Sequence, residues 1–280
     1  MSEQAQVDVV IPCFNGAATL RAQLSALAEQ QSSVPFRVVV ADNGSTDGSA
    51  EVVAEFDDRF EVADASARRG INHARNAGIA HGAAPLVLLC DVDDLVHPGW
   101  VEAYWRCFSD GAELMGGSLR RVSDQAAPLG EWQRVLNDNL GFLPWATGAN
   151  CGFARSVVGA IGPFDESYRG GGDETEWFWR AQLAGHRLVF VDDAAIDYVR
   201  RPTTAGAFRQ NRAFGASHVR LYRQFGAAGM PRPGLAPITR LLPRTVLGLA
   251  RSPRDPVRRR ALVAQLGQWV GRAEALRRGG

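Results

Sequence analysis

Short apolar runs alternate along the first 91 residues with segments whose apolar residues recur at helical spacing. Strands are predicted at 7–12, 36–42, 59–64 and 85–91, and helices at 17–30, 43–56 (after a turn) and 71–82. The strand FRVVVAD (36–42) is apolar almost throughout, which is typical of a parallel sheet covered on both faces. This alternation predicts an α/β fold with a doubly wound, mostly parallel, Rossmann-like sheet.

The pattern is less regular after residue 100. A helix is predicted near 100–108 and a strand or turn region around 113–122, whereas 124–145 receives no assignment. A glycine-rich loop then precedes an acidic helix that stops at Gly185, and the strand RLVFVD (187–192) follows. We expect a catalytic domain over residues 1–225 and a helical, basic C-terminal extension over 226–280.

Candidate chemistry lies where the strand LVLLC (86–90) ends in Asp91, Asp93 and Asp94. Ligands of doubly wound sheets bind beyond the carboxyl ends of the strands. Carboxylates clustered this closely repel one another unless a cation lies between them, and Mg²⁺ and Mn²⁺ prefer oxygen ligands. A metal site is therefore predicted, and the alternative is a solvated turn before the next helix.

Composition and charge narrow the possible chemistry. All 31 basic residues are arginines, which excludes lysine nucleophiles, Schiff bases and the lysine of a phosphate loop. Residues 230–280 hold eleven of these arginines against Asp255 and Glu274, so this segment carries +9 and the rest −8. The four cysteines form no closely spaced pair, and no leader or spanning segment is evident, so a cytoplasmic protein is expected.

Six motifs in register resemble the family 2 glycosyltransferases of the GT-A fold over about residues 7–225. They are VVIPCFNG, VVVADNGSTDGS, ARNAGIAHG, LLCDVDD, TGANCGFARSVVGAIGPFDESY and GGDETEWFWRAQLAG. The resemblance implies a GT-A sheet whose first half binds a nucleotide sugar, with UDP as the first expected nucleotide. It also implies a divalent cofactor, Mn²⁺ or Mg²⁺.

The resemblance implies a set of donor-binding residues, namely Pro12, Phe14, Asn15, Asp42, Arg75, Asn76, Asp91 and Asn150. For several of these a structural role is an open alternative. Phe14 also fits a core position, Asp42 fits the first residue of a side-chain-capped turn, and Asn150 fits an ordinary turn. Arg75 also fits a helix-surface arginine paired with an acid.

The metal is expected on Asp93, with Asp91 facing the ribose or a metal-bound water and Asp94 the least defined of the three. Many relatives carry a histidine ligand after the last strand, where this chain has Asp197. Aspartate is a harder ligand than imidazole, so Asp197 is expected to take that role.

Inverting glycosyl transfer needs a carboxylate that accepts the proton of the attacking hydroxyl. The resemblance implies this base in the acid pair of GGDETEW, with Glu174 as the base and Asp173 as its support. The family more often has aspartate in the second place, which leaves the assignment between the two open, and Glu176 is a further candidate. Trp177 and Trp179 fit either an acceptor platform or packing, and Arg200, Arg201, Arg209 and Arg212 fit a clamp on the diphosphate.

The sequence thus predicts a non-processive, metal-dependent inverting glycosyltransferase that acts on a glycan or glycolipid in cell-surface polysaccharide synthesis. A non-catalytic scaffold that binds nucleotide sugars is the alternative, while a phosphatase or nucleotidyltransferase explains the motifs poorly. The basic extension fits an interfacial helix on an anionic membrane at the inner face of the plasma membrane, or a helix packed on protein. No nucleic-acid partner is expected, and the oligomeric state stays open.

Overall fold

The computed structural model describes residues 4–123, 125–199, 203–234, 245, 247–248 and 256–278. The chain forms two compact units. Unit 1 comprises 1–137, 144–167 and 177–200, and unit 2 comprises 138–143, 168–176 and 201–280. The expected domain boundary at residue 225 falls within unit 2.

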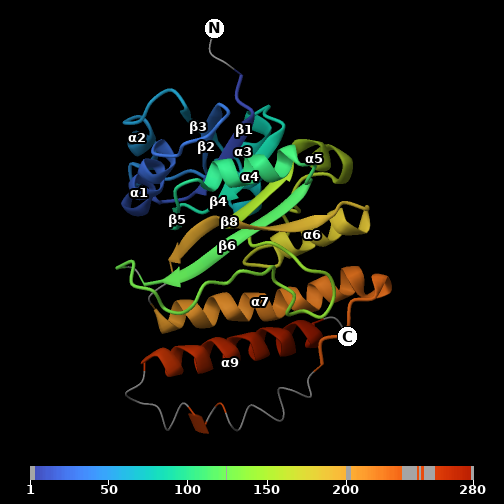
Figure 1. The fold of residues 1–280 in the computed structure, drawn as a ribbon. Helices are drawn as coiled ribbons and strands as arrows, with labels where there is room; N and C mark the ends of the chain where they lie inside the picture. The colour runs from blue at the N-terminus through green and yellow to red at the C-terminus, as the bar shows by residue number, and fades with distance from the viewer. Residues whose placement is uncertain are drawn as a thin grey trace. The chain divides into compact units, whose positions relative to one another are not determined.

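Unit 1 is built on an eight-stranded sheet in the order β3-β2-β1-β4-β7-β6-β8-β5 (Figure 1). The strands are β1 (Val7–Cys13), β2 (Phe36–Asp42), β3 (Phe60–Asp64), β4 (Leu86–Cys90), β5 (Leu95–Val96), β6 (Leu114–Val122), β7 (Asn150–Ala154) and β8 (Leu188–Val199). The first four strands pair in parallel, β7 is antiparallel to β4 and β6, and β5 is antiparallel to β8. The mostly parallel α/β sheet predicted from the sequence is confirmed.

The helices joining these strands lie where the sequence predicted helices, except α5, for which no helix was predicted. They are α1 (Ala17–Ala28), α2 (Ser49–Val53), α3 (Ile71–His81), α4 (Trp100–Ser109), α5 (Arg155–Ile161) and α6 (Asp173–Leu183). Residues 43–56 form the predicted turn followed by a short helix, and Gly44 and Gly48 have positive φ in that turn. β8 runs on to Val199, well past the predicted end of its strand at 192.

The core of unit 1 explains the apolar character of β1 and β4. All seven residues of β1 and all five of β4 are buried. A strand in the middle of a parallel sheet is covered on both faces, so both sets of alternating side chains are mostly apolar. The exception is Asp8 of β1, whose buried carboxylate is paired with Arg37 and Arg155.

Unit 2 contains α7 (Thr204–Phe225), η1 (Gly226–Ala228) and α9 (Pro256–Arg277). α7 and α9 run in parallel, with backbones so close that glycines occupy the contact. A Cβ at Gly267 would lie 2.6 Å from the Phe208 carbonyl oxygen, and one at Gly271 would lie 1.8 Å from that of Arg212. The side of α9 that carries these glycines thus packs on protein.

The sequence allowed two roles for this extension, a helix lying on a membrane surface and a helix packed on protein. Apolar residues of α9 are spread around the helix, whereas an interfacial helix has one apolar face. Residues 235–244 and 249–255, which hold the proline-rich part of the extension, lie outside the described residues. Membrane binding by the extension stays a prediction.

Candidate donor and metal site

The acidic cluster follows directly from the end of β4. One carboxylate oxygen from each of Asp91, Asp93 and Asp94 lies within 4.8 Å of the others. Asp91 and Asp93 are partly exposed, and Asp94 is 4% exposed. Three carboxylates at this spacing repel unless a cation joins them, and hard divalent ions take oxygen ligands. The donor set therefore fits Mg²⁺ or Mn²⁺.

Two protein contacts orient this cluster. The Val199 amide donates to Asp94 Oδ1 at 2.8 Å, which ties the end of β8 to the cluster. The guanidinium of Arg75, on α3, lies 3.9 Å from Asp91 Oδ1 and is almost completely buried. Arg75 is therefore not a helix-surface arginine, because its guanidinium is buried and lies beside Asp91.

Gly148 makes room for that guanidinium. A Cβ at position 148 would lie 2.3 Å from one Arg75 terminal nitrogen and 2.8 Å from Cζ. The Arg75 guanidinium also stands 5.6 Å from the centroid of the Phe164 ring. The TGAN motif thus contributes a residue without a side chain where Arg75 needs space.

The end of β2 carries a polar turn that the sequence predicted in outline. Asp42 Oδ1 accepts from the Ser45 amide at 2.9 Å, the bond of a side-chain-capped turn. Asn15, at φ 51°, accepts from the Thr46 amide at 2.9 Å. Pro12 is buried within β1. The turn after β1 is thereby fastened to the turn after β2.

Phe14 stands exposed beside this turn, with 52% of its surface open to solvent. Phe14 therefore does not occupy a core position, which was the alternative that its sequence context allowed. The guanidinium of Arg69 lies 4.1 Å from the Phe14 ring centroid, and its Nη1 donates to the Asn43 carbonyl at 2.8 Å. Arg69 was not predicted from the sequence. The feature that could have identified it is its position directly before Gly70, where α3 begins.

Asn76 and Asn150, which were both expected to contact the donor, use their side-chain amides for hydrogen bonds within the protein. Asn76 donates to the Phe164 carbonyl at 2.9 Å and accepts from the Phe164 amide at 3.0 Å. Both its amide nitrogen and its oxygen are therefore engaged with the loop after α5. This geometry favours a structural role for Asn76 over the expected contact with the nucleotide.

Asn150, the expected sugar ligand, is fully buried. Its oxygen accepts from the Trp100 indole and the Tyr104 hydroxyl, both at 2.8 Å. Its nitrogen donates to the carbonyls of Ser118 and Ala194 at 2.8 and 2.9 Å. With both ends of its amide engaged, Asn150 links β7 to α4, β6 and β8 and has no hydrogen-bonding group left for a sugar.

Asp197, the expected third metal ligand, lies outside the acidic cluster. Arg120 binds both of its oxygens, at 2.9 and 3.0 Å, and this bond raises the pKa of Arg120. His97 Nε2 lies 3.2 Å from Asp197 Oδ2. The parallel pairing of β6 with β8 aligns Arg120 with Asp197, and the sequence alone does not reveal this register. The geometry favours Asp94 over Asp197 as the third carboxylate.

The predicted catalytic acids lie in unit 2, in the first turn of α6. Asp173 and Glu176 are 4% and 2% exposed, whereas Glu174 is partly exposed. Gln224 donates to Glu176 Oε1 at 2.8 Å. Among these acids Glu174 is therefore the one with most access to an acceptor.

Of the remaining candidates, the two tryptophans pack in the core and Arg212 forms an ion pair. Trp177 and Trp179 are both fully buried, and Trp177 stacks on Phe164 with centroids 5.0 Å apart, which identifies packing as their role. Arg212 pairs with Glu274 at 2.7 Å, and Arg209 is exposed. Arg200 and Arg201 lie outside the described residues.

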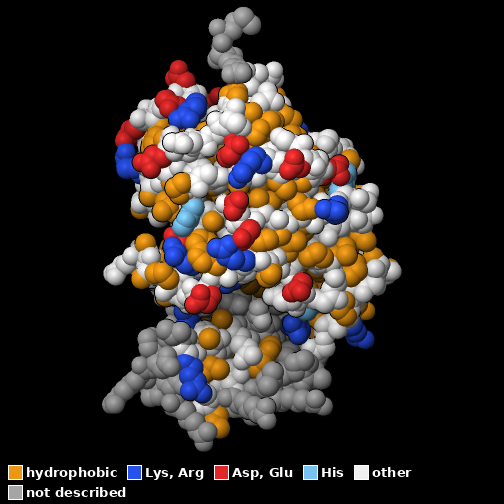
Figure 2. All heavy atoms as spheres, in the orientation of Figure 1, with side chains coloured by type: hydrophobic (Ala, Val, Ile, Leu, Met, Phe, Trp, Pro, Cys, Tyr) orange, Lys and Arg blue, Asp and Glu red, His pale blue; other side chains and the backbone are white. Residues whose placement is uncertain are grey.

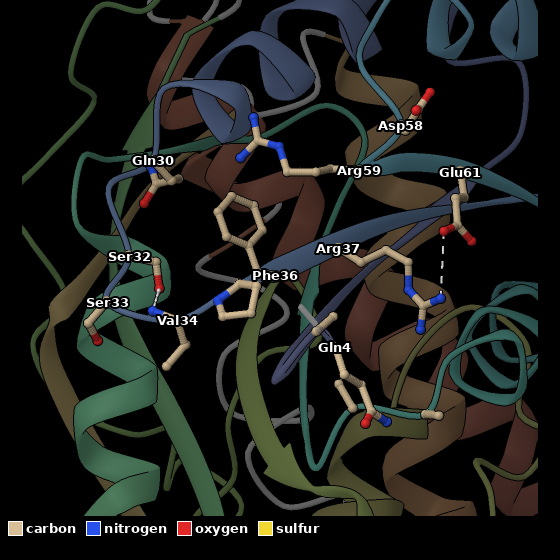
Figure 3. A pocket seen from close by; sticks show the side chains of 14 residues that line it. Gln4, Gln30, Ser32, Ser33, Val34, Phe36, Arg37, Asp58, Arg59 and Glu61 are labelled. Atoms are coloured by element: carbon tan, nitrogen blue, oxygen red, sulfur yellow. Dashed lines mark hydrogen bonds and ion pairs between the residues drawn. The ribbon is translucent and has the colours of Figure 1, made fainter. Parts of the chain in front are cut away.

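A polar hollow of about 710 Å³ lies at the other edge of the sheet, where β2 begins (Figure 3). Its two arginines are engaged. Arg37 pairs with the buried Asp8 at 2.9 Å, and Arg59 pairs with Asp57 at 3.1 Å while lying over Phe36. Despite its size, this hollow offers less chemistry than the acidic cluster, because both of its arginines are already paired with carboxylates.

Acidic and basic side chains are interspersed on the face of unit 1 drawn in Figure 2. Nucleic-acid-binding surfaces instead carry a basic stripe or patch. Among the described residues, no helix is long and apolar enough to cross a membrane.

Comparisons with known proteins relate the chain to a family. Residues 8–146 match the family model described as Glycosyl transferase family 2. Glycosyltransferase AglE of Haloferax volcanii is 28% identical over 206 residues, which are 70% of this chain and 67% of the relative. Succinoglycan biosynthesis protein ExoA of Rhizobium meliloti is 26% identical over 260 residues, covering 86% of this chain and 76% of the relative.

Solved structures show the same fold. The mannosyltransferase PcManGT from Pyrobaculum calidifontis, in complex with GDP-Man and Mn²⁺, superposes with a TM-score of 0.64 at 18% identity. The match covers 100% of this chain and 89% of that one. At this identity the likeness concerns the fold alone.

Proposed function

Because this chain belongs to glycosyl transferase family 2 and has the GT-A fold, we propose that it is a metal-dependent, inverting, non-processive glycosyltransferase that uses a nucleoside-diphosphate sugar. The observation that carries the proposal is the cluster of Asp91, Asp93 and Asp94 at the carboxyl end of β4. Such a cluster is costly to maintain without a ligand, because its charges repel.

In the proposed mechanism these three carboxylates would hold Mn²⁺ or Mg²⁺, which would supply positive charge to offset the negative charge of the departing diphosphate. Arg75 offsets part of the negative charge of Asp91 from below and holds that carboxylate in place. The protein thus prepares an arrangement of fixed charges before the donor arrives, and little reorganisation remains for the reaction itself.

We assign the nucleotide to the carboxyl ends of β1 and β2. Phe14 offers an exposed ring with Arg69 stacked on it, a surface suited to a planar base. Asp42 closes the turn beside that ring and has the carboxylate that the resemblance assigns to the base or ribose. UDP is the nucleotide we test first. The neighbour that contains GDP-Man makes GDP the second.

Glu174 is the proposed general base. The acceptor hydroxyl attacks the anomeric carbon and passes its proton to Glu174, while the bond from that carbon to the diphosphate oxygen breaks. The partial exposure of Glu174 supports this role over Asp173 and Glu176, which are buried. Asp173 adds negative charge beside the base at the start of α6, where the helix dipole stabilises acids.

The acceptor we propose is a hydroxyl of a glycan or glycolipid used for cell-surface polysaccharide. The name of the related succinoglycan biosynthesis protein supports this class. A reaction that proceeds equally well on simple soluble sugars would contradict it.

A non-catalytic scaffold that binds nucleotide sugars is the second candidate. The observation in its favour is Asp197, which stands where many relatives have a histidine and is bound by Arg120. Such a scaffold would bind the nucleotide with metal but transfer no sugar.

The test is calorimetric binding of UDP, GDP, dTDP and ADP, each with Mn²⁺, with Mg²⁺ and with EDTA. We expect one nucleotide to stabilise the protein only with metal, and Asp93→Asn to abolish the effect. Asp110→Asn, an exposed position after α4, is the matched control. The loss of binding in Asp197→Asn but not in Asp93→Asn would move the metal site to β8. Binding without sugar transfer to any acceptor would favour the scaffold.

A further inference from the structure

The loop before the catalytic acids has a backbone that glycine alone adopts readily. Gly170, Gly171 and Gly172 have φ angles of +87°, +122° and +79°, one after another. Each position would strain an L-residue by about 1–2 kcal/mol. Three such residues in a row do not hold a single conformation by themselves, because glycine loses the most conformational freedom on ordering. Some other part of unit 2 must therefore fix the loop.

α7 provides the surface on which the loop lies. A Cβ at Gly171 would stand 2.2 Å from the Phe214 ring, and one at Gly172 would stand 2.9 Å from Ser217 Cβ. The Ser217 hydroxyl donates to the Gly171 carbonyl at 2.6 Å. The loop is thus in direct contact with α7 two residues before Asp173.

The same helix also binds the chain after the acids. Gln224 donates from its amide nitrogen to Glu176 Oε1 at 2.8 Å. Its amide oxygen accepts from the Tyr168 hydroxyl at 2.9 Å, and the Arg220 guanidinium lies 3.6 Å from the Tyr168 ring centroid. Since Glu176 is 2% exposed, its carboxylate depends on protein donors such as Gln224 in place of water.

These contacts come from one face of α7. Ser217, Arg220 and Gln224 follow one another at spacings of three and four residues, which places their side chains on one side of a helix. They bracket Asp173 and Glu174, because one bond lies before the pair and the other lies after it. α7 also lies beyond residue 146, where the match to the family model ends.

We propose that α7 positions the catalytic acids, with Ser217 and Gln224 as positioning residues that fix the backbone on either side of Asp173 and Glu174. The inference rests on the proposed function, since it presumes that these acids carry the chemistry. Displacement of a catalytic group by about 1 Å costs up to about a hundredfold in rate. Loss of either bond should therefore lower kcat.

The sharpest test exchanges the two partners. Gln224→Glu sets two carboxylates against each other and removes the bond to Glu176. The double variant Glu176→Gln, Gln224→Glu restores an amide–carboxylate bond of opposite direction, and residue 224 still accepts from the Tyr168 hydroxyl. We expect kcat to fall at least about tenfold in Gln224→Glu, and the double variant to recover to within about threefold of wild type. The donor KM should stay within about twofold in both, because the proposed donor residues lie in unit 1.

Gln210→Glu, the same change earlier on α7, is the matched control and should leave kcat unchanged. A Gln224→Glu variant with wild-type kcat would overturn the proposal. A double variant as inactive as Gln224→Glu would also overturn it, and would point to Glu176 itself as the base.

Hydrogen exchange of the full chain provides a readout that needs no activity. The amides of 170–176 should exchange faster in Ser217→Ala and Gln224→Glu than in wild type and Gln210→Glu. Unchanged exchange would contradict the positioning role. A wild-type protein that transfers no sugar would refute the proposed function instead, so the two failures are distinguishable.

Discussion

Replacement of Gly148 by alanine tests whether Arg75 supports the acidic cluster. The added Cβ would lie 2.3 Å from an Arg75 terminal nitrogen, so the guanidinium must retreat by about 1 Å to reach an ordinary contact. Arg75 is 3% exposed and has little room to move. Overpacking of this kind costs about 1–3 kcal/mol.

The expected result has a stability part and a ligand part. Each kcal/mol lowers the Tm by about 2–4 °C in a chain of this size, so Gly148→Ala should melt about 2–12 °C lower. Because the clash displaces the guanidinium that stands 3.9 Å from Asp91, the Mn²⁺ Kd should also change by at least about threefold. Thermal unfolding and metal titration by calorimetry measure the two effects.

Gly159→Ala is the matched control, because a Cβ there would meet nothing within 4 Å and helix α5 favours alanine. It should be neutral or stabilising, with unchanged metal affinity. The clash also predicts non-additivity, since Arg75→Ala should remove most of the additional cost of Gly148→Ala. A Gly148→Ala protein with wild-type Tm and Mn²⁺ affinity would refute the packing argument.

Three further outcomes follow from other contacts. Asn150→Ala should destabilise the protein by about 3–5 kcal/mol in urea unfolding, because it leaves buried donors such as the Trp100 indole without an acceptor; a neutral result would contradict its core role. Burial, aided by Arg272, lowers the pKa of His218 to about 4 from 6.5. The unfolded chain thus binds a proton first, and stability should fall as the pH drops from 6.5 to 4, by about 3 kcal/mol at most. His218→Gln should flatten the dependence of Tm on pH over this window, and an unaltered profile would exclude the histidine. Glu174→Gln should abolish sugar transfer while nucleotide binding with Mn²⁺ stays unchanged; retained transfer would assign the base elsewhere.

The fold of the first 91 residues could be predicted because each of its elements has its own local signal. Apolar runs identified β1, β2 and β4, and helical spacing identified α1 and α3. Residues 124–145 have no such signal, and the pairing of those that the structure describes is limited to isolated bridges, such as those between residues 119 and 133 and between 137 and 145. Tertiary context alone specifies a segment of this kind.

The site was predictable as far as its residues are close in sequence. Asp91, Asp93 and Asp94 share one turn, and their clustering follows from that spacing. The surroundings of Asp197 depend on the register between β6 and β8, which brings Arg120 to it from far along the chain. The hydrogen bonds of Asn150 likewise depend on three segments far apart in the sequence, α4, β6 and β8. Contacts between residues far apart in the sequence cannot be recognised from the local pattern of apolar and polar residues.

The close approach of α7 and α9 has an evolutionary consequence. A Cβ at Gly215 would lie 2.0 Å from the Gln268 carbonyl oxygen, and Gly267 and Gly271 are as tightly placed. Every single-nucleotide change of a glycine codon that introduces another residue adds at least a Cβ, so no such replacement fits at these positions unless the helices move apart. The two helices can then diverge only through paired changes, and this seam should drift more slowly than the surfaces around it.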